Sequence, residues 1–237
     1  MKGCYINLDT ISNDHHHHGW LIHQKRSGSS SLRLTVLSKH RGLISCMYRG
    51  GANVPKKSRP ELFQPCWYQF DEKHYGTWVK TCEPLALAPQ LSHEQLMSAL
   101  YINEIIYYSL RYDDPHVLVF DAYSHTMNVL VESSDGMALQ GALRRFEYSL
   151  LHACGYGLVF EEAGGMPLDE TAHYHYDVDA GFKKAKTGYS GVHLLALSRD
   201  ELTDANVMKT AKSLMRHAIH HLVGGRDIKT RTLWSTS

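Results

Sequence analysis

The chain has 237 residues, of which 43% are hydrophobic, and a chain of this length usually forms one or two domains with a real core. No run of 18 apolar residues occurs, and the N-terminus lacks a basic stretch followed by an apolar one, so we expect neither a membrane span nor a signal peptide. The five cysteines are odd in number and never spaced as CxxC, which argues against a disulfide framework or a zinc site and fits a reducing cytoplasm.

The net charge of +1 conceals a strong asymmetry along the chain. Residues 1–82 hold 12 Lys and Arg against 5 Asp and Glu, residues 83–170 hold 3 against 13, and residues 171–237 hold 10 against 6. A basic first part attracts a polyanion through its phosphates, whereas the acidic middle part must serve another purpose.

Residues 1–19 are predicted to form an irregular lead-in that contains four consecutive histidines, from His15 to His18. Histidines bind transition metals, but four of them on an irregular segment do not hold a closed tetrahedral site with fixed geometry. We therefore predict no metal site in this segment.

Residues 20–82 are predicted to form a small barrel. Ser31–Leu37 alternates apolar and polar residues with period two, as a half-buried strand does. Turn residues separate five such runs, which are Trp20–His23, Ser31–Leu37, Leu43–Tyr48, Leu62–Phe70 and Thr77–Thr81. Five short strands with turn signals between them predict a closed barrel of the OB type.

Basic residues cluster in two connections of the predicted barrel, between aromatic residues. The candidate DNA-binding residues here are Lys39, Arg41, Arg49, Lys56, Lys57 and Arg59, and the aromatic residues are Tyr48, Trp67, Tyr68, Tyr75 and Trp78. A positive groove with stacking faces holds single-stranded nucleic acid without sequence preference. The alternative is that the tryptophans belong to the core and the lysines only keep a loop soluble.

Residues 83–237 are predicted to form a helical domain. Ser92 and Gln95 make a capping box for a helix that ends by Asp114, because Pro115 disfavours helical geometry before it. Two further helices are expected over Val117–Val131 and Ala138–Cys154. The fold class is therefore α+β, with an OB barrel followed by helices.

The third of these helices has two distinct faces. Its apolar residues Leu143, Phe146 and Leu150 recur at spacings of 3 and 4 and should face a core. On the polar side, Arg144 and Tyr148 lie one turn apart, so a guanidinium sits beside an aromatic ring. Such a pair suits an anionic ligand with an apolar end, and the alternative is an ordinary solvated face.

Residues 158–190 interrupt the helical pattern as a small insert, in which His173–Asp177 and Gly181–Lys186 are predicted to form a hairpin. Nothing specifies a fourth ligand beside its two histidines and aspartate, so we expect no metal there. The final helix runs from a cap at Asp204 to Val223. Its basic face and the following tail supply further candidate phosphate contacts, which are Lys209, Lys212, Arg216, Lys229 and Arg231.

Motifs of catalysis are missing from the sequence. It contains no GxxxxGK[ST] or GxGxxG phosphate loop, no HExxH and no GxSxG. We therefore predict a binding protein without a cofactor. A nucleic-acid-processing enzyme, the rival from another class, requires clustered carboxylates or a metal site.

Four motifs, in this order, resemble the RecO family of bacterial DNA-repair and recombination mediators: Leu100-Tyr-Ile-Asn-Glu104, Leu143-Arg-Arg-Phe-Glu147, Gly155-Tyr-Gly157 and Gly224-Gly-Arg-Asp-Ile-Lys-Thr-Arg231. The resemblance implies a cytoplasmic, nucleoid-associated protein that binds single- and double-stranded DNA and anneals complementary strands. It also implies work with RecR, and through it RecF, in loading RecA onto DNA coated by the single-strand-binding protein SSB.

The resemblance further implies recognition of the acidic, Phe-ended C-terminal tail of SSB. Arg144 falls on the first Arg of the family's Leu-Arg-Arg-Phe-Glu motif, and Tyr148 lies one turn on. Many family members carry a four-cysteine zinc site after Gly-Tyr-Gly, but Leu158–Ala180 contains no cysteine, so we expect a metal-free version. A second rival is an adaptor that holds RecR-like partners without touching DNA.

Overall fold

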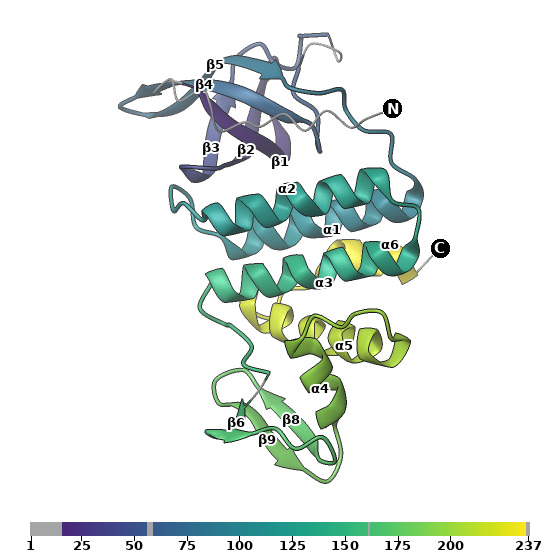
Figure 1. The fold of residues 1–237 in the computed structure, drawn as a ribbon. Helices are drawn as coiled ribbons and strands as arrows, with labels where there is room; N and C mark the ends of the chain where they lie inside the picture. Colours follow the sequence, from purple (N-terminus) through teal and green to yellow (C-terminus); the bar gives the residue numbers. More distant parts are fainter. Residues whose placement is uncertain (1–15, 56–58, 161, 236–237) are drawn as a thin grey trace.

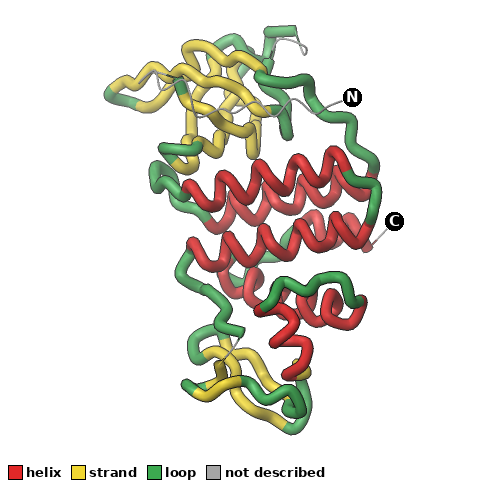
Figure 2. The backbone as a smooth tube through the Cα atoms, in the orientation of Figure 1, coloured by secondary structure: helices red, strands yellow, loops and turns green. Residues whose placement is uncertain are grey.

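The computed structural model describes residues 16–55, 59–160 and 162–235. Its elements form successive tiers, with the barrel at one end, the helices in the middle and a small sheet at the other end (Figures 1 and 2). No helix in these ranges combines the length and hydropathy needed to cross a membrane.

The predicted five-stranded barrel is confirmed. Its strands are β1 (His17–Ser27), β2 (Ser31–Ser38), β3 (Gly42–Tyr48), β4 (Pro65–Lys73) and β5 (Gly76–Pro84). They close in the order β1-β2-β3-β5-β4, with β3 and β5 parallel and the other pairs antiparallel. The interior is filled by apolar side chains such as Leu34, Ile44 and Tyr68.

The irregular lead-in is shorter than predicted, because β1 begins at His17 and not at Trp20. His17 pairs with Tyr68 and His18 with Trp67, and these pairs help to close the barrel between β1 and β4. The pairing partner lies some fifty residues downstream, which is why local sequence patterns did not reveal it. Of the histidine run, His15 lies outside the described residues.

The helical domain is also confirmed, and its bounds lie close to those expected. Its helices are α1 (His93–Ser109), α2 (Val117–Glu132), α3 (Gly136–Ala153), α4 (Gly191–Ser198), α5 (Ala205–Leu222) and α6 (Lys229–Ser235). The capping box of Ser92 and Gln95 is present, and the Asp204 side chain caps α5. The helix α6 was not predicted, because its sequence resembles an irregular basic tail.

The insert contains the predicted hairpin, formed by β8 (His173–Asp177) and β9 (Gly181–Ala185). The two-residue strand β10 (Tyr189–Ser190) adds to β8, and β6 (Glu162–Ala163) pairs with β7 (Met166–Pro167). Within the described ranges, no three His, Cys, Asp or Glu side chains are grouped so that they could hold a metal ion.

The barrel and the helices share one apolar core, which places the two domains in direct contact. Asn103 of α1 donates from Nδ2 to the carbonyl oxygen of Ile22 at 3.0 Å, and Tyr123 of α2 donates to Asn103 Oδ1 at 2.7 Å. Gly42 has φ +70°, and a Cβ added there would lie 2.0 Å from the carbonyl oxygen of Asp114. Only glycine therefore allows β3 to approach the α1–α2 connection so closely.

Candidate functional site

A buried ion pair on α3 forms the centre of the candidate site. Arg144 Nε lies 3.0 Å from Glu147 Oε2, and Arg144 Nη2 donates to Glu147 Oε1 at 3.0 Å. Arg144 is 8% exposed and Glu147 is 1% exposed. The solvated-face alternative for Arg144 is therefore wrong, because the side chain is buried and fixed by a carboxylate one turn away.

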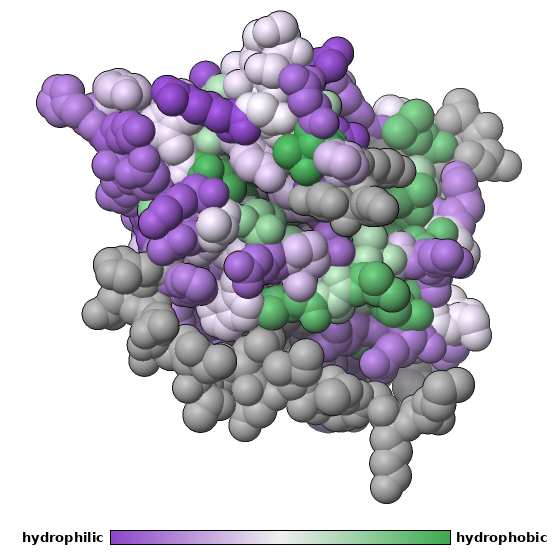
Figure 3. Space-filling model, turned by 90° about the horizontal axis from the view of Figure 1, so that it is seen from above, coloured by the Kyte–Doolittle hydropathy of each residue, from purple (hydrophilic) through white to green (hydrophobic). Residues whose placement is uncertain are grey.

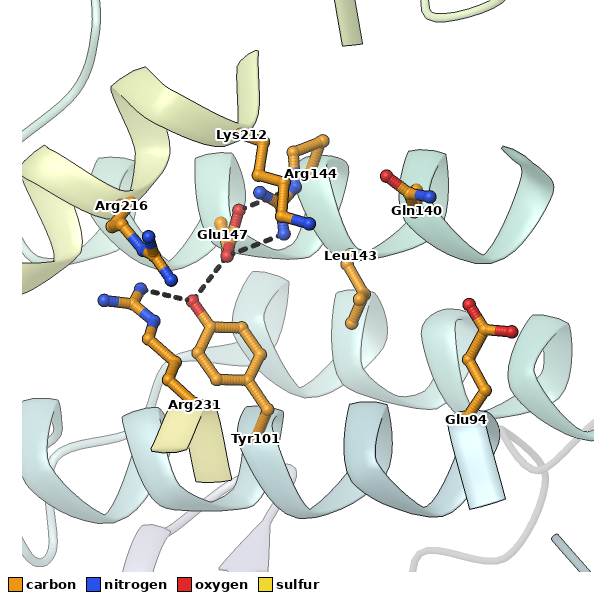
Figure 4. Close-up of a pocket in the computed structure, with 9 residues that line it drawn as sticks. All are labelled: Glu94, Tyr101, Gln140, Leu143, Arg144, Glu147, Lys212, Arg216 and Arg231. Carbon is orange, nitrogen blue, oxygen red and sulfur yellow. Dashed lines mark hydrogen bonds and ion pairs between the residues drawn. The ribbon is translucent and has the colours of Figure 1, made fainter. Parts of the chain in front are cut away.

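Two other elements extend this pair into a network (Figure 4). The Tyr101 hydroxyl of α1 donates to Glu147 Oε1, and Arg231 Nη2 of α6 donates to the Tyr101 oxygen at 2.9 Å. Burial and the adjacent Glu147 carboxylate raise the pKa of Tyr101 well above its usual value, so this hydroxyl remains a proton donor at neutral pH. The network thus holds Arg144, Glu147 and Arg231 in fixed positions.

The α6 helix is itself held in place by a carboxylate of α1. Glu104 accepts hydrogen bonds from the backbone N–H groups of Lys229 and Thr230, at 2.8 and 3.0 Å, and from the Thr230 hydroxyl at 2.8 Å. These are the free N–H groups at the start of a helix, where a negative charge is favourable. Glu104 thereby fixes the helix that delivers Arg231 to Tyr101.

A cavity of about 330 Å³ opens beside the network. Cationic side chains from three helices line it, namely Arg144, Lys212, Arg216 and Arg231, together with the carboxylates of Glu94 and Glu147. Figure 4 shows Lys212 and Arg216 of α5 on the same side of the cavity as Arg144. Since Arg144 already neutralises Glu147, the cavity keeps an excess of positive charge and suits an anionic ligand.

A second cavity, also of about 330 Å³, shares Arg144 with the first. Its lining includes a group of apolar side chains, Phe160, Leu197, Leu202, Ala211 and Met215, which is absent from the lining of the first cavity. Tyr148 also lines it and stacks on Phe160 with the ring centroids 5.8 Å apart. The arrangement therefore places an apolar pocket next to a cationic one, with Arg144 on the boundary.

The two residues predicted for the tail site consequently have different surroundings. Arg144 lines both cavities, whereas Tyr148 lines only the apolar one, where its side chain is 37% exposed. An exposed ion pair between Arg145 and Asp200, with N–O distances of 2.9 and 2.8 Å, lies at the apolar cavity. A ligand with acidic groups and an aromatic end could occupy both cavities together.

The described basic residues predicted for DNA binding have different surroundings. In the barrel, Lys39 pairs with Asp121 of α2 at 3.3 Å, and Arg41 pairs with Glu72 and with Asp113. Arg49 lies 4.1 Å from the ring centre of Trp78. Of the rest of this loop, Arg59 is half-buried, and Lys56 and Lys57 lie outside the described residues.

The predicted basic residues of α5 and the tail fall into two groups, those that line the cationic cavity and those that do not. Lys212, Arg216 and Arg231 line the cationic cavity, so the structure places them with Arg144 and not with the barrel. Lys209 and Lys229 are exposed and lie outside that lining. Among the aromatic residues, Trp67 and Trp78, which the alternative assigned to the core, are half-buried. Tyr68 is fully buried and Tyr75 is 70% exposed.

Sequence reasoning missed Glu147, Tyr101 and Glu104 as parts of the site. The spacing of three residues between Arg144 and Glu147 is a detectable signal for a helical ion pair. Tyr101 and Glu104 lie in the motif Leu100–Glu104, but the motif did not reveal their role, because their partner Arg231 and the start of α6 lie 125 to 130 residues away. Their contribution depends on the tertiary fold.

The sequence of the chain is similar to those of known proteins. A family model described as the C-terminal part of recombination protein O matches residues 91–231. A DNA repair protein RecO of Legionella pneumophila (strain Paris) is 38% identical over 218 residues, which cover 91% of this chain and 95% of the relative. RecO proteins of Alkalilimnicola ehrlichii and of Enterobacter sp. (strain 638) are 32% and 30% identical, each over 91% of this chain and over 88% and 96% of their own lengths.

Proposed function

Because the chain belongs to the RecO family of DNA repair proteins, we propose that it is a recombination mediator that docks the C-terminal tail of SSB and binds DNA. It binds single- and double-stranded DNA and anneals complementary strands. With RecR, and through it RecF, it helps to load RecA onto SSB-coated DNA. The family membership supports the role in DNA repair, and the two cavities support the tail as a ligand.

One observation carries the proposal of tail binding. Four cationic side chains surround one cavity, and one of them, Arg144, also borders an apolar cavity beside Tyr148 and Phe160. An acidic peptide with a C-terminal Phe presents carboxylates and one large apolar side chain next to each other. Carboxylates gain charge-assisted hydrogen bonds in the cationic cavity, while the ring is removed from water in the apolar one.

The helix α5 offers a matched pair of variants to test this. Lys212→Glu reverses a charge that lines the cationic cavity, and Lys209→Glu reverses an exposed charge of the same helix outside that lining. We expect Lys212→Glu to weaken binding of an acidic, Phe-ended peptide by at least about fivefold, the equivalent of about 1 kcal/mol. Lys209→Glu should change the affinity less than about twofold, measured by fluorescence anisotropy or calorimetry.

Equal effects of the two substitutions would show that only long-range charge matters, and would remove the cationic cavity from the proposal. A peptide that lacks the terminal Phe provides the second control. The wild-type protein should bind this shortened peptide more weakly than the full peptide, because no Phe ring fills the apolar cavity. For the same reason, substitutions of Tyr148 should hardly change the affinity for the shortened peptide.

The DNA-binding part of the proposal rests on the barrel. Arg49 and its contact with Trp78 combine a phosphate-binding charge with a base-stacking ring. We expect the logarithm of single-strand affinity to fall linearly with the logarithm of salt concentration, with a slope of about −0.7 per neutralised phosphate. Arg49→Glu should lower both affinity and slope, whereas a salt-independent constant would contradict phosphate-dominated binding.

The ion pairs of Lys39 and Arg41 favour the rival adaptor function, because carboxylates already neutralise these two predicted DNA contacts. If replacing Lys56, Lys57 and Arg59 by Glu leaves DNA affinity unchanged, the adaptor function is favoured. A strand-annealing assay on SSB-coated DNA, with and without the SSB tail, separates the two functions directly.

A further inference from the structure

Side chains on four neighbouring strands form a row across the outside of the barrel. Lys25 of β1 is paired with Arg33 of β2, Arg33 with Met47 of β3, and Met47 with Trp78 of β5. Residues that are directly opposite each other on neighbouring strands project from the same face, about 4.8 Å apart. At the Trp78 end, the Arg49 guanidinium lies 4.1 Å from the ring centre, and Asp71 of β4, directly opposite Trp78, pairs with Lys73 at 3.1 Å. The row therefore has an aromatic ring at one end and the positive charges of Lys25 and Arg33 at the other.

The two basic residues of this row, Lys25 and Arg33, lie side by side on neighbouring strands. Lys25 and Arg33 are exposed and directly opposed, and neither pairs with a carboxylate in the part of the chain that the structure describes. Like charges placed directly opposite each other destabilise a sheet. An anionic ligand lying over both side chains relieves that repulsion. By contrast, Lys39 and Arg41 of the same barrel are already neutralised.

Aromatic rings continue the row beyond the barrel onto the helical domain. The ring of His23, two residues before Lys25 on β1, lies 4.9 Å from the ring of Tyr107 on α1. Tyr107 contacts Tyr108 edge-on at 5.4 Å, and the Arg226 guanidinium lies 5.4 Å from the centre of the Tyr108 ring. Tyr107 is 37% exposed, so part of its ring is open to a ligand.

The junction between the two domains keeps this series of side chains rigid. Asn103, one turn before Tyr107 on α1, donates to the carbonyl oxygen of Ile22, the residue that precedes His23. The barrel row and the rings of α1 are therefore fixed relative to each other. Seen from the barrel end, the surface mixes hydrophobic and hydrophilic side chains (Figure 3).

We propose that one single strand of nucleic acid follows a continuous path from Trp78, over Lys25 and Arg33, across the domain junction to Tyr107 and Arg226. The inference rests on the proposed DNA binding and assigns to it residues that the basic-loop pattern did not predict. Phosphates contact Lys25, Arg33 and Arg226, and unstacked bases stack on the rings. A duplex keeps its bases stacked internally, so the rings select a single strand.

The path makes binding depend on strand length in a specific way. Its barrel segment alone spans about 14 Å, from three inter-strand spacings, and the α1 rings lie beyond it. A short oligonucleotide of about 3 nucleotides spans about 10 Å at about 3.4 Å per nucleotide and covers no more than the barrel segment, whereas one of about 20 nucleotides is long enough to reach Tyr107 as well. Only the long strand should therefore respond to changes at Tyr107.

The experiment measures the affinity of both oligonucleotides for Tyr107→Ala, Tyr107→Phe and Lys25→Glu, with Lys186→Glu as the charge-matched control. Lys186 is exposed in the insert, away from the barrel. For the long oligonucleotide we expect losses of at least about fivefold in Tyr107→Ala and Lys25→Glu, since stacking of one base contributes about 1–3 kcal/mol. Tyr107→Phe and Lys186→Glu should stay within about twofold, and Tyr107→Ala should not affect the short oligonucleotide.

Unchanged long-strand affinity in Tyr107→Ala overturns the path. Equal losses of affinity for the short and long strands in Tyr107→Ala also overturn it, because Tyr107 would then not be a contact that only the long strand reaches. A wild-type protein that binds neither oligonucleotide removes the proposed DNA-binding function itself. That outcome is distinct from failure of the path, in which wild-type binding of both strands persists.

Discussion

Replacing Arg144 by Met should destabilise the protein more than replacing both members of its ion pair. Glu147 is 1% exposed, and two of its contacts come from Arg144. The single variant leaves the carboxylate buried, and among the described residues only the Tyr101 hydroxyl still donates a hydrogen bond to it. A buried charge that loses its partner is far less favourable than a buried apolar side chain of similar volume.

The expected magnitude follows from that burial. Breaking a buried ion pair from one side typically costs about 3–5 kcal/mol of unfolding free energy. The remaining hydrogen bond from Tyr101 places Arg144→Met near the lower end, at about 3 kcal/mol. The double variant Arg144→Met/Glu147→Met removes both charges and should lose less than the single variant. Against a typical total of about 5–15 kcal/mol, the difference is easily measured.

Urea unfolding followed by circular dichroism gives the free energy of each variant and completes a double-mutant cycle. The reasoning fails if Arg144→Met loses less than about 1 kcal/mol, the value typical of an exposed pair. It also fails if the double variant loses the sum of the two single losses. The result bears on peptide assays, because Arg144→Glu would place two carboxylates together in the interior and disturb the fold as well as the binding site.

Three further predictions concern the domain junction and α6. Burial, with a smaller contribution from the Lys39 charge, lowers the pKa of His18 to about 4, so the folded protein binds fewer protons than the unfolded chain between about pH 6.5 and 4. The free energy of unfolding therefore decreases by about 3 kcal/mol as the pH falls from about 6.5 to about 4, because the unfolded chain takes up the proton that folded His18 does not. Thermal melts of His18→Gln should show a weaker dependence on acid pH than those of the wild type. Gly42→Ala should lower the free energy of unfolding by about 2–4 kcal/mol, because the added methyl group would meet the Asp114 carbonyl. Gly50→Ala, at φ +68° but with open space around it, should lower it by only about 1–2 kcal/mol. Equal decreases for the two variants in chemical unfolding would contradict the close approach at Gly42. Glu104→Ala should release the start of α6, which hydrogen exchange would detect as faster exchange at the Lys229 and Thr230 amides, and unchanged protection would show that α6 is held by other contacts.

Elements specified by neighbouring residues were predictable from the sequence. The capping box of Ser92 and Gln95 involves a span of three residues, and the alternation in Ser31–Leu37 reports directly which side chains enter the barrel. The start of β1 was not predictable in this way, because His17 and His18 become strand residues by pairing with β4. Similarly, α6 begins where Glu104 supplies a carboxylate from a distant helix.

The candidate site shows the same division. Arg144 and Tyr148 were identifiable from their spacing on one helix and from the family motif. Sequence alone did not separate phosphate contacts from cavity residues on α5, because Lys209, Lys212 and Arg216 look equivalent along one basic face. Only the packing of α5 against α3 shows that Lys212 and Arg216 line the cavity and Lys209 does not.

The distance in sequence between Tyr101 and Arg231 also orders events during synthesis. These partners are 130 residues apart, so at about 5–20 residues per second Tyr101 leaves the ribosome about 7–26 s before Arg231. In the later part of that interval, α1 and α3 have both been synthesised but the helix that completes the cationic cavity has not. A nascent chain therefore presents Arg144 and Glu147 without their full set of neighbours, and the complete cavity forms only after α6 has emerged and docked on Glu104.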